Sequence, residues 1–364
     1  MPDQLRILHV TEAMGGGIVT FIASIAVRQV NTGAAVAVLY AERPDTPPRE
    51  DLRERFGDQV VLRAAISESG ALRRLSELAR EVRRSIRSGS YDVIHLHSSI
   101  AGAVGRIVAG AARRSGVVIA YSPHGFAFLR EDSSRVMRLS TRLVERVLAN
   151  RGTMILTSKS ELALAKEALH ARRATYLMSG VPRESMKMRL PGQSRGQKPR
   201  VVMLGRMAYQ KAPWRFAAVA RRLAHEADFI WIGAADPVHV ARWIGDAPVQ
   251  VISWLTPERF SQELENTDVL LFPTLWEGMS LSLIQAMGRG IPPVTTDVVG
   301  NRDAVIHQVS GFIARNDDEL VDFTQSLVRD QGLRERVGAQ AFLRAATHFI
   351  DDQIGIESIE LYSI

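Results

Sequence analysis

Residues 272–290 read FPTLWEGMSLSLIQAMGRG and form the most informative segment of this chain. The apolar run Val269–Phe272 predicts a strand, and the turn after it holds an acidic residue, Glu277, and a glycine, Gly278. A helix is predicted next, because apolar residues recur there at helical spacing: Leu281, Ile284 and Met287. A turn that directs backbone N–H groups into a helix N-terminus can bind phosphate, and a carboxylate beside it can accept hydrogen bonds from sugar hydroxyls. The segment indicates a sugar-phosphate pocket, although a plain strand-turn-helix has the same pattern.

Short β-rich runs alternate with helical patterns along the whole chain, and this alternation predicts α/β architecture with parallel, doubly wound sheets. In the first half the predicted strands are Arg6–Thr11, Ala35–Tyr40, Asp92–His97, Val117–Ser122 and Thr153–Thr157. In the second half they are Arg200–Leu204, Asp228–Gly233, Val249–Ser253, Val269–Phe272 and Pro293–Thr296. Helices are predicted between them, for example at Ala71–Arg87 and Ser134–Ala149.

A chain of 364 residues suits two domains of ordinary size. Residues 189–200, RLPGQSRGQKPR, have the composition of a linker between two Rossmann-type domains. In open parallel sheets ligands bind beyond the carboxyl ends of the strands. Several distinctive loops are predicted at such ends: GGG at 15–17, SPHGF at 122–126, GRMAYQK at 205–211 and LWEGMS at 275–280. If the two domains face each other, these loops line one cleft.

Composition excludes several classes of protein. The chain has no Cys, so disulfides, thiolate catalysis and Cys-based metal sites are excluded. No apolar run approaches the roughly 20 residues that span a bilayer, and the opening MPDQLRILHVTEAMGGG lacks the pattern of a signal peptide, so we expect a cytoplasmic protein. Residues 1–190 hold 29 Lys and Arg against 18 Asp and Glu, whereas residues 191–364 hold 17 against 21. The basic first half indicates an anionic partner, but no zinc-finger spacing or RNA-binding aromatic pattern points to nucleic acid.

Two features of the first half are candidate ligand contacts. Gly15, Gly16 and Gly17 follow the first predicted strand, where they allow close backbone approach to a phosphate or form only a tight turn. They do not match G-x-G-x-x-G, so nicotinamide binding is not expected. His124 ends another strand, where a neutral imidazole can donate to a substrate hydroxyl or a developing charge, or serve structurally. His95 and His97 alternate on a buried strand and do not by themselves form a metal cluster.

Arg206 and Lys211 flank the turn after the strand Arg200–Leu204, where two cations are either surface charges or a phosphate clamp. The sequence has no Asp-x-Asp pair to hold a divalent metal on a diphosphate. If the protein breaks a sugar–diphosphate bond, fixed cations and the helix N-terminus after Gly278 must therefore neutralise the leaving group. No metal and no cofactor are expected.

The order of these motifs resembles glycosyltransferase family 4, which are retaining nucleotide-sugar transferases with the GT-B fold of two Rossmann-like domains. The similarity covers nearly the whole chain and rests on GGGIVTF, SPHGF, GRMAYQK, PTLWEGMSLSLIQAMGRGIPPV and the GFIA at 311–314. It implies an acceptor-binding domain at 1–190 and a nucleotide-sugar-binding domain at 191–345. It also implies a C-terminal helix, about 346–364, that packs back on the first domain.

The resemblance also implies roles for single residues. Arg206 and Lys211 bind the donor diphosphate, and Glu277 binds the donor sugar as the first acid of an E-x7-E motif. His124 lies near that sugar, and Gly16 and Gly17 approach the phosphate and sugar. The remaining donor contacts lie in the turn and the helix after Glu277: Gly278, Met279, Ser280, Leu281 and Gln285.

Two positions depart from the pattern of the family. Gln285 stands where the family has the second acid, which accepts hydrogen bonds from the ribose, and Ser280 replaces a common glycine. Gln keeps a carbonyl acceptor and loses the charge. We therefore expect altered donor affinity or preference rather than loss of activity.

The predicted function is transfer of a sugar from a nucleotide-sugar to a glycan or lipid-linked acceptor in bacterial surface polysaccharide synthesis. A sugar-nucleotide epimerase and a GT-B protein that binds sugar nucleotides without turnover remain as alternatives. A further expectation is peripheral docking of the first domain on an anionic membrane at its inner face. Arg138 and Arg142 recur at helical spacing with Arg135 and Arg146 in the helix 134–149, and 71–87 is a second basic, amphipathic helix. Both helices could equally bury their apolar faces in the core.

Overall fold

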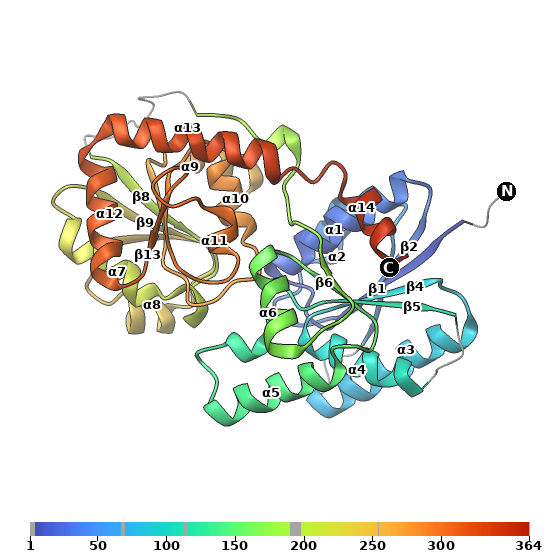
Figure 1. Cartoon of the computed structure of the whole chain (residues 1–364). Helices are drawn as coiled ribbons and strands as arrows, with labels where there is room; N and C mark the ends of the chain where they lie inside the picture. The colour runs from blue at the N-terminus through green and yellow to red at the C-terminus, as the bar shows by residue number, and fades with distance from the viewer. Residues whose placement is uncertain (1–3, 67–69, 112–115, 190–197, 254, 364) are drawn as a thin grey trace. The chain divides into compact units, whose positions relative to one another are not determined.

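The computed structural model describes residues 4–66, 70–111, 116–189, 198–253 and 255–363, which form two compact units (Figure 1). The first unit comprises Met1–Leu129, Ser133–Ser179 and Asp351–Ile364. The second comprises Arg130–Asp132 and Gly180–Ile350. Most of the linker predicted at 189–200 lies outside the described residues, since 190–197 are not among them.

The first unit is built on a seven-stranded sheet in the order β3-β2-β1-β4-β5-β6-β7, and every pairing among these strands is parallel. The strands are β1 (Arg6–Thr11), β2 (Ala35–Ala41), β3 (Val61–Ile66), β4 (Val93–His97), β5 (Val118–Ser122), β6 (Thr153–Leu156) and β7 (Ala174–Tyr176). Strand order reverses between β1 and β4, so the crevice for a ligand is expected at their carboxyl ends.

Helices cover both faces of this sheet. Successive side chains of a strand point to opposite faces, and on each face they pack with helix residues in an apolar cluster. One face carries α1 (Gly16–Asn31), α2 (Arg49–Phe56) and the C-terminal helix α14 (Ile354–Leu361). The other cluster includes residues of α3 (Ala71–Ser88), α4 (Ser99–Ala111) and α6 (Lys159–Leu169). The helix α5 (Arg135–Leu148) is capped by the residue before it, Ser134, whose hydroxyl accepts a hydrogen bond from the backbone N–H of Met137.

The second unit is a six-stranded parallel sheet in the order β10-β9-β8-β11-β12-β13. Its strands are β8 (Arg200–Leu204), β9 (Asp228–Ile232), β10 (Val249–Ile252), β11 (Val269–Phe272), β12 (Pro293–Thr296) and β13 (Phe312–Ala314). Its helices are α7 (Pro213–Leu223), α8 (Pro237–Trp243), α9 (Pro257–Glu265), α10 (Leu281–Met287), α11 (Asn301–Ala304), α12 (Asp317–Arg329) and α13 (Gln331–His348). The reversal of strand order here lies between β8 and β11.

The division between the units differs from the boundary predicted at 190. Residues 180–189 belong to the second unit, because Val181 donates a backbone hydrogen bond to the carbonyl of Phe349, and Arg189 forms an ion pair with Asp268 at 3.0 Å. The C-terminal helix also begins later than the predicted 346, since α13 ends at His348 and α14 begins at Ile354. Figure 1 shows α14, in red, beside α1, in blue, and the two helices pack closely within the first unit.

All ten predicted strands are present, within one residue at each end. The sequence missed β3 and β7, which lie at the two edges of the first sheet. It assigned no strand to β13, although GFIA was noted as a motif. Among the described residues, no helix has the length and apolar character needed to cross a membrane.

Candidate functional site

The loops after β8 and β11 meet at the point where strand order reverses in the second sheet. The loop after β8 runs from Gly205 to Lys211 and ends in a short 3-10 turn, Tyr209–Lys211. The loop after β11 carries Glu277 and leads into α10. Hydrogen bonds join them: the backbone N–H of Leu275 donates to the carbonyl of Gln210 at 2.9 Å, and the Gln210 side chain donates to the carbonyl of Trp276 at 2.7 Å.

Lys211 and Glu277 form an ion pair at the centre of these loops. Lys211 Nζ donates to Glu277 Oε1 at 2.7 Å and lies 4.6 Å from the centre of the Phe272 ring. The side chains are only 15% and 8% exposed, so solvent screens this pair weakly. The sequence placed both residues in one site, and the structure shows a direct contact between them.

Two glycines allow close backbone approaches beside this pair. A Cβ on Gly300 would lie 2.1 Å from the carbonyl oxygen of Gly278, and Gly300 has a φ of +83°. A Cβ on Gly233 would lie 2.2 Å from the carbonyl oxygen of Gly205, where φ is +147°. Side chains larger than hydrogen at 233 or 300 would therefore displace the loops that carry Lys211 and Glu277.

The other predicted donor contacts of the second unit surround the same turn. Arg206 lies in the β8 loop and is exposed. Gly278 and Ser280 are buried, whereas Met279, Leu281 and Gln285 are half-buried. Ser280 is the residue before α10, and its side chain makes no cap hydrogen bond, so the backbone N–H groups of the first turn have no side-chain cap there.

In the first unit, the predicted residues lie at the carboxyl edge of the sheet. Gly16 and Gly17 begin α1, Gly16 has a φ of +58°, and a Cβ on either would meet nothing within 4 Å. His124 follows β5, is half-buried and has a φ of +56°, in the left-handed region that costs energy for a side chain of this kind. The ring of Phe21, on α1, lies edge-on to the His124 ring at 4.8 Å.

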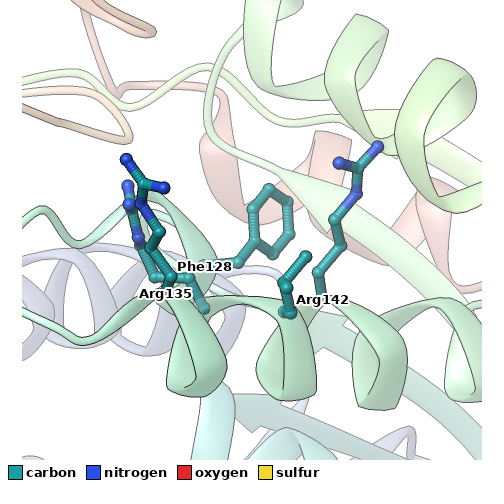
Figure 2. Close-up of a pocket in the computed structure, with 5 residues that line it drawn as sticks. Phe128, Arg135 and Arg142 are labelled. Carbon is teal, nitrogen blue, oxygen red and sulfur yellow. The ribbon is translucent and has the colours of Figure 1, made fainter.

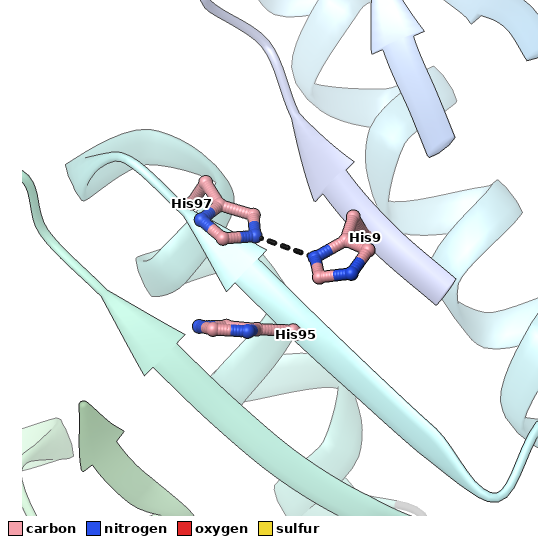
Figure 3. A group of neighbouring side chains, drawn as sticks. All are labelled: His9, His95 and His97. Atoms are coloured by element: carbon pink, nitrogen blue, oxygen red, sulfur yellow. Dashed lines mark hydrogen bonds between the residues drawn. The ribbon is translucent and has the colours of Figure 1, made fainter. Parts of the chain in front are cut away.

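Three further histidines lie next to one another on β1 and β4: His9, His95 and His97 (Figure 3). Contacts with Gln29 of α1 and with Tyr362 place them on the face of the sheet that α1 and α14 cover. His9 Nδ1 and His97 Nε2 are 2.9 Å apart, as are His97 Nδ1 and His124 Nε2. His9 Nε2 lies 2.8 Å from Gln29 Oε1. His95 contacts the Tyr362 hydroxyl and the Ser122 hydroxyl, each at 2.9 Å.

His9, His95 and His97 come close enough together to be considered as metal ligands, since their ligand atoms lie within 4.8 Å of one another. Each of their six ring nitrogens, however, already has a hydrogen-bond partner in the protein. The trio is therefore described better as part of a hydrogen-bonded network than as a metal site.

Burial lowers the pKa of all four histidines. It lowers the pKa of His9 to about 4 and that of His124 to about 3. The pKa values of His95 and His97 lie well below the usual value for the same reason, and their histidine neighbours lower them further. At neutral pH every imidazole of the network is therefore uncharged.

The structure separates the two basic helices that the sequence grouped together. Leu78, Val82 and Ile86 of α3 are buried, so this helix uses its apolar face in the core. On α5 the corresponding side chains are exposed: Val136 by 76%, Leu143 by 63% and Val147 by 62%. On the opposite face of α5, the buried Glu145 anchors the helix to α4 and β5, because its carboxylate accepts from Arg106 and from Tyr121, each at 2.7 Å.

Arg138 and Arg142 of α5 line a pocket of about 230 Å³ together with Phe128, Arg135 and Leu139. In Figure 2 the Phe128 ring lies between the side chains of Arg135 and Arg142. Within the part of the chain that the structure describes, the buried Nε of Arg138 has no hydrogen-bond partner. The pocket thus combines apolar walls with three cations and can accept an anionic group.

Sequence reasoning missed several residues of these sites. Glu12, at the carboxyl end of β1, accepts from the Ser98 hydroxyl and from the backbone N–H of Ala101 at 3.1 Å, and burial raises its pKa. Asn301 is fully buried and donates to the Thr274 hydroxyl at 3.1 Å. His9 was missed because it is far in sequence from His97. The strand RILHVT held one signal for it, a histidine in the middle of an apolar run.

Comparisons with known proteins identify the family and the fold of the chain. Residues 16–180 match the family described as "Glycosyl transferase 4-like domain", and residues 198–330 match "Glycosyl transferases group 1". The chain is 25% identical, over 67% of each sequence, to the UDP-Gal:alpha-D-GlcNAc-diphosphoundecaprenol alpha-1,3-galactosyltransferase of Escherichia coli. Its fold resembles sucrose-phosphate synthase from Thermosynechococcus elongatus (TM-score 0.82, 16% identity, 99% of this chain and 98% of the other). It also resembles Anabaena HepE in complex with UDP-glucose (TM-score 0.80, 18% identity, 99% and 100%).

Proposed function

This chain belongs to the family 4 glycosyltransferases, with the GT-B fold, and we propose that it transfers a sugar from a nucleoside diphosphate donor to a lipid-linked acceptor with retention of anomeric configuration. The observation that carries this proposal is the Lys211–Glu277 pair at the reversal point of the second sheet. It places a cation suited to a diphosphate beside a carboxylate suited to sugar hydroxyls. The names of the relatives do not favour an epimerase or a protein that only binds sugar nucleotides.

The donor diphosphate is bound by the second unit in this proposal. An ammonium group has three N–H donors, and Lys211 uses one on Glu277, so two remain for phosphate oxygens. Arg206 adds a second cation from the same loop, and the uncapped first turn of α10 adds backbone N–H groups. Glu277 Oε2 accepts from the sugar, and the Gln285 carbonyl accepts from the ribose.

Transfer breaks the bond between the anomeric carbon and the diphosphate oxygen and forms a bond from that carbon to an acceptor oxygen. Negative charge grows on the leaving diphosphate, where Lys211, Arg206 and the N-terminus of α10 stabilise it. The proton of the acceptor hydroxyl passes to a departing phosphate oxygen on the same face of the sugar. These fixed groups supply the counter-charge, so the proposed reaction needs no divalent metal and no cofactor.

The names of the similar proteins narrow the choice of substrates. The Escherichia coli relative is named for UDP-Gal and a diphosphoundecaprenol acceptor, and Anabaena HepE was solved with UDP-glucose. We propose a UDP-hexose as the donor and a diphospholipid-linked sugar as the acceptor. In the first unit, Gly16 and Gly17 allow a phosphate or sugar to approach the backbone, and His124 contacts a ligand hydroxyl.

A lipid-linked acceptor requires that the enzyme reach a membrane, and α5 is the element suited to this. Its exposed apolar side chains accompany the arginines that line the pocket, a combination typical of helices that lie in the membrane interface. Arg138 and Arg142 then contact anionic lipid phosphates, and the protein works as a cytoplasmic enzyme docked on the inner face of the membrane.

The experiment that tests this function determines the anomeric configuration of the product. The protein is incubated with UDP-galactose or UDP-glucose and a diphosphoundecaprenol-linked N-acetylglucosamine, with a chelator present. Proton NMR of the product is expected to show an α linkage formed from the α-configured donor. A β linkage would exclude retention, and restoration of transfer only by added Mg²⁺ or Mn²⁺ would exclude metal independence.

A further inference from the structure

The hydrogen bonds of the histidine network have a definite direction, which two backbone carbonyl groups determine. The Ser122 hydroxyl has one proton and donates it to the carbonyl of Ile155 at 2.6 Å. It can therefore only accept from His95, so His95 carries its proton on Nε2 and has a lone pair on Nδ1. That lone pair must accept from the Tyr362 hydroxyl, which lies 2.9 Å away.

The same reasoning fixes the orientation of the Gln29 amide. Because Tyr362 donates to His95, its hydroxyl oxygen accepts from the amide nitrogen of Gln29 at 3.0 Å. The Ser358 hydroxyl donates to the carbonyl of Gly355, so it too accepts from that nitrogen, at 2.9 Å. The oxygen of the Gln29 amide is thus the atom that faces His9.

An amide oxygen accepts only, and this determines every proton along the chain of histidines that leads to the sheet edge. His9 must donate to Gln29 from Nε2, so His9 Nδ1 accepts from His97 Nε2. His97 Nδ1 then accepts from His124 Nε2. The remaining ring nitrogen of His124, Nδ1, therefore carries a lone pair, and its hydrogen bonds within the described residues include none to the other histidines. The low pKa values of the four rings agree with this, because a neutral imidazole has only one proton to donate.

We propose that Gln29, through His9 and His97, fixes the tautomer of His124, so that His124 Nδ1 acts as a hydrogen-bond acceptor for a hydroxyl group of the bound substrate. Gln29, His9 and His97 are positioning residues, since they act on the substrate only through His124. A phosphate oxygen or a carbonyl is disfavoured at this nitrogen, because two acceptors would face each other. His124 therefore selects for a hydroxyl, which differs from the donor role considered from the sequence.

The C-terminal segment takes part in the network. Ser358 lies on α14 and Tyr362 directly follows it, and both accept from the Gln29 amide, whose orientation they hold. Ser24 and Arg28 of α1 pair with Asp351 just before α14 and fasten the same region. Residues at the end of the chain, more than 300 positions after Gln29, therefore help to determine which nitrogen of His124 is protonated.

The direct test is ¹⁵N NMR of the ligand-free protein with ¹⁵N-labelled histidine, assigned by single histidine substitutions. In the wild-type protein, Nε2 of His9, His97 and His124 should be protonated, and Nδ1 of each ring should be unprotonated. Couplings between nitrogens across the His124–His97 and His97–His9 hydrogen bonds should be visible with Nε2 as the donor. A proton on Nδ1 of His124 would overturn the proposal without any variant.

Variants of Gln29 separate positioning from stability. Gln29→Met has similar volume and no acceptor, so His124 should change from one tautomer to a mixture of two. Tyr121→Phe is the matched control, because it removes a buried hydroxyl that donates to Glu145 outside the network, and it should leave His124 unchanged. An unchanged His124 tautomer in Gln29→Met would contradict the proposal.

The consequence for activity rests on the proposed function, and the two can fail separately. With UDP-hexose donors, Gln29→Met should lower turnover by about tenfold or more, the scale seen when the partner that orients a histidine is lost, whereas Tyr121→Phe should retain most of it. If no protein form transfers sugar but the NMR pattern holds, the proposed function fails and the tautomer assignment stands. If Gln29→Met has a mixed His124 tautomer but full turnover, His124 Nδ1 does not accept a hydrogen bond from the substrate, and that part of the proposal is wrong.

Discussion

At the scale of single residues, the Lys211–Glu277 pair has a structural role and, in the proposed reaction, a catalytic one. A cation placed where charge grows contributes more to the transition state than to the ground state, so its loss lowers the rate of transfer. The same lysine also neutralises a carboxylate that is 8% exposed. Removing one partner of such a pair leaves the other charge unpaired and destabilises the fold.

We predict that Lys211→Ala and Arg206→Ala each lower turnover by roughly 100- to 1,000-fold at saturating donor, the usual cost of losing one such group. Arg206 is exposed, so Arg206→Ala should leave the melting temperature nearly unchanged. The matched control is Arg222→Ala in the same unit, which removes an exposed ion pair with Asp318 and should retain full turnover. Near-full transfer by either test variant would show that its cation does not bind the diphosphate.

The neutral histidines predict how stability depends on pH. Their folded pKa values lie below the 6.5 of an unfolded histidine, so below pH 6.5 the unfolded chain binds protons that the folded protein does not. The free energy of unfolding should therefore be greatest above pH 6.5 and fall as the pH drops from 6.5 towards 4. Each histidine adds up to about 1.4 kcal/mol per pH unit to this slope.

Urea denaturation between pH 7.5 and 5 measures that slope. Carboxylates with lowered pKa values contribute little in this window; the pKa of Glu226, for example, is lowered to about 2 by its hydrogen bonds with Arg329, so its stabilisation is lost only below about pH 4.5. Glu12, whose pKa is raised by burial, acts against the four histidines, because its folded carboxyl binds a proton more readily than its unfolded one. A free energy of unfolding that is flat from pH 6.5 to 5 would contradict neutral burial of the network.

Local sequence correctly indicated which loop residues lie near one another in the second unit. Lys211 and Glu277 could be assigned to one site because each follows a strand in a recognisable loop. The histidine network could not be foreseen, because Gln29, His9, His97 and Tyr362 come from separate elements and carry no mutual spacing. The register of β1 against β4, which pairs His9 with His95, brings the strand histidines together, and α1 and the C-terminal segment add Gln29 and Tyr362.

At the scale of secondary-structure elements, α3 and α5 share a pattern of basic and apolar residues but lie in different environments. Both are basic and amphipathic, and their patterns predicted the same behaviour. Periodicity identifies an apolar face without showing what covers it, and the structure shows that the sheet covers the face of α3 only.

We predict that α5 binds anionic membranes and α3 does not. Liposome sedimentation should show binding that requires anionic lipid and weakens with salt, because arginines near such a surface contribute about 1 kcal/mol each. Arg138→Glu with Arg142→Glu should abolish most of this binding. Arg83→Glu with Arg87→Glu on α3 makes the same change in net charge and should retain it. Equal loss with both pairs would attribute binding to net charge rather than to α5.

A second prediction at this scale concerns the packing of α14 on α1. A Cβ on Gly355 would lie 2.5 Å from the backbone carbon of Arg28, so Gly355→Ala should force the two helices apart. We expect a loss of about 1–3 kcal/mol in the free energy of unfolding. Gly332→Ala on α13 would meet only the Asp330 carboxylate at 3.4 Å and should be neutral or stabilising. Urea denaturation of both variants provides the comparison, and equal stabilities would refute the tight packing.

At the scale of the whole molecule, the sequence predicted two parallel sheets because strand and helix patterns alternate regularly along the chain. The limits of the units were harder to predict. Residues 180–189 look like the end of the first half in sequence, but a backbone hydrogen bond to Phe349 and an ion pair to Asp268 assign them to the second unit. Contacts of this kind depend on residues far along the chain, which local patterns do not show.

The central claim is that this chain transfers sugar from a nucleotide-sugar to an acceptor, and acceptor-dependent release of nucleoside diphosphate measures it most directly. UDP-, GDP- and dTDP-hexoses are each incubated with the protein and a diphosphoundecaprenol-linked sugar, with Lys211→Ala as the inactive control. We predict release of UDP from a UDP-hexose that requires both the acceptor and Lys211. Donor binding with no release of any nucleoside diphosphate, or release that Lys211→Ala leaves unchanged, would contradict the account.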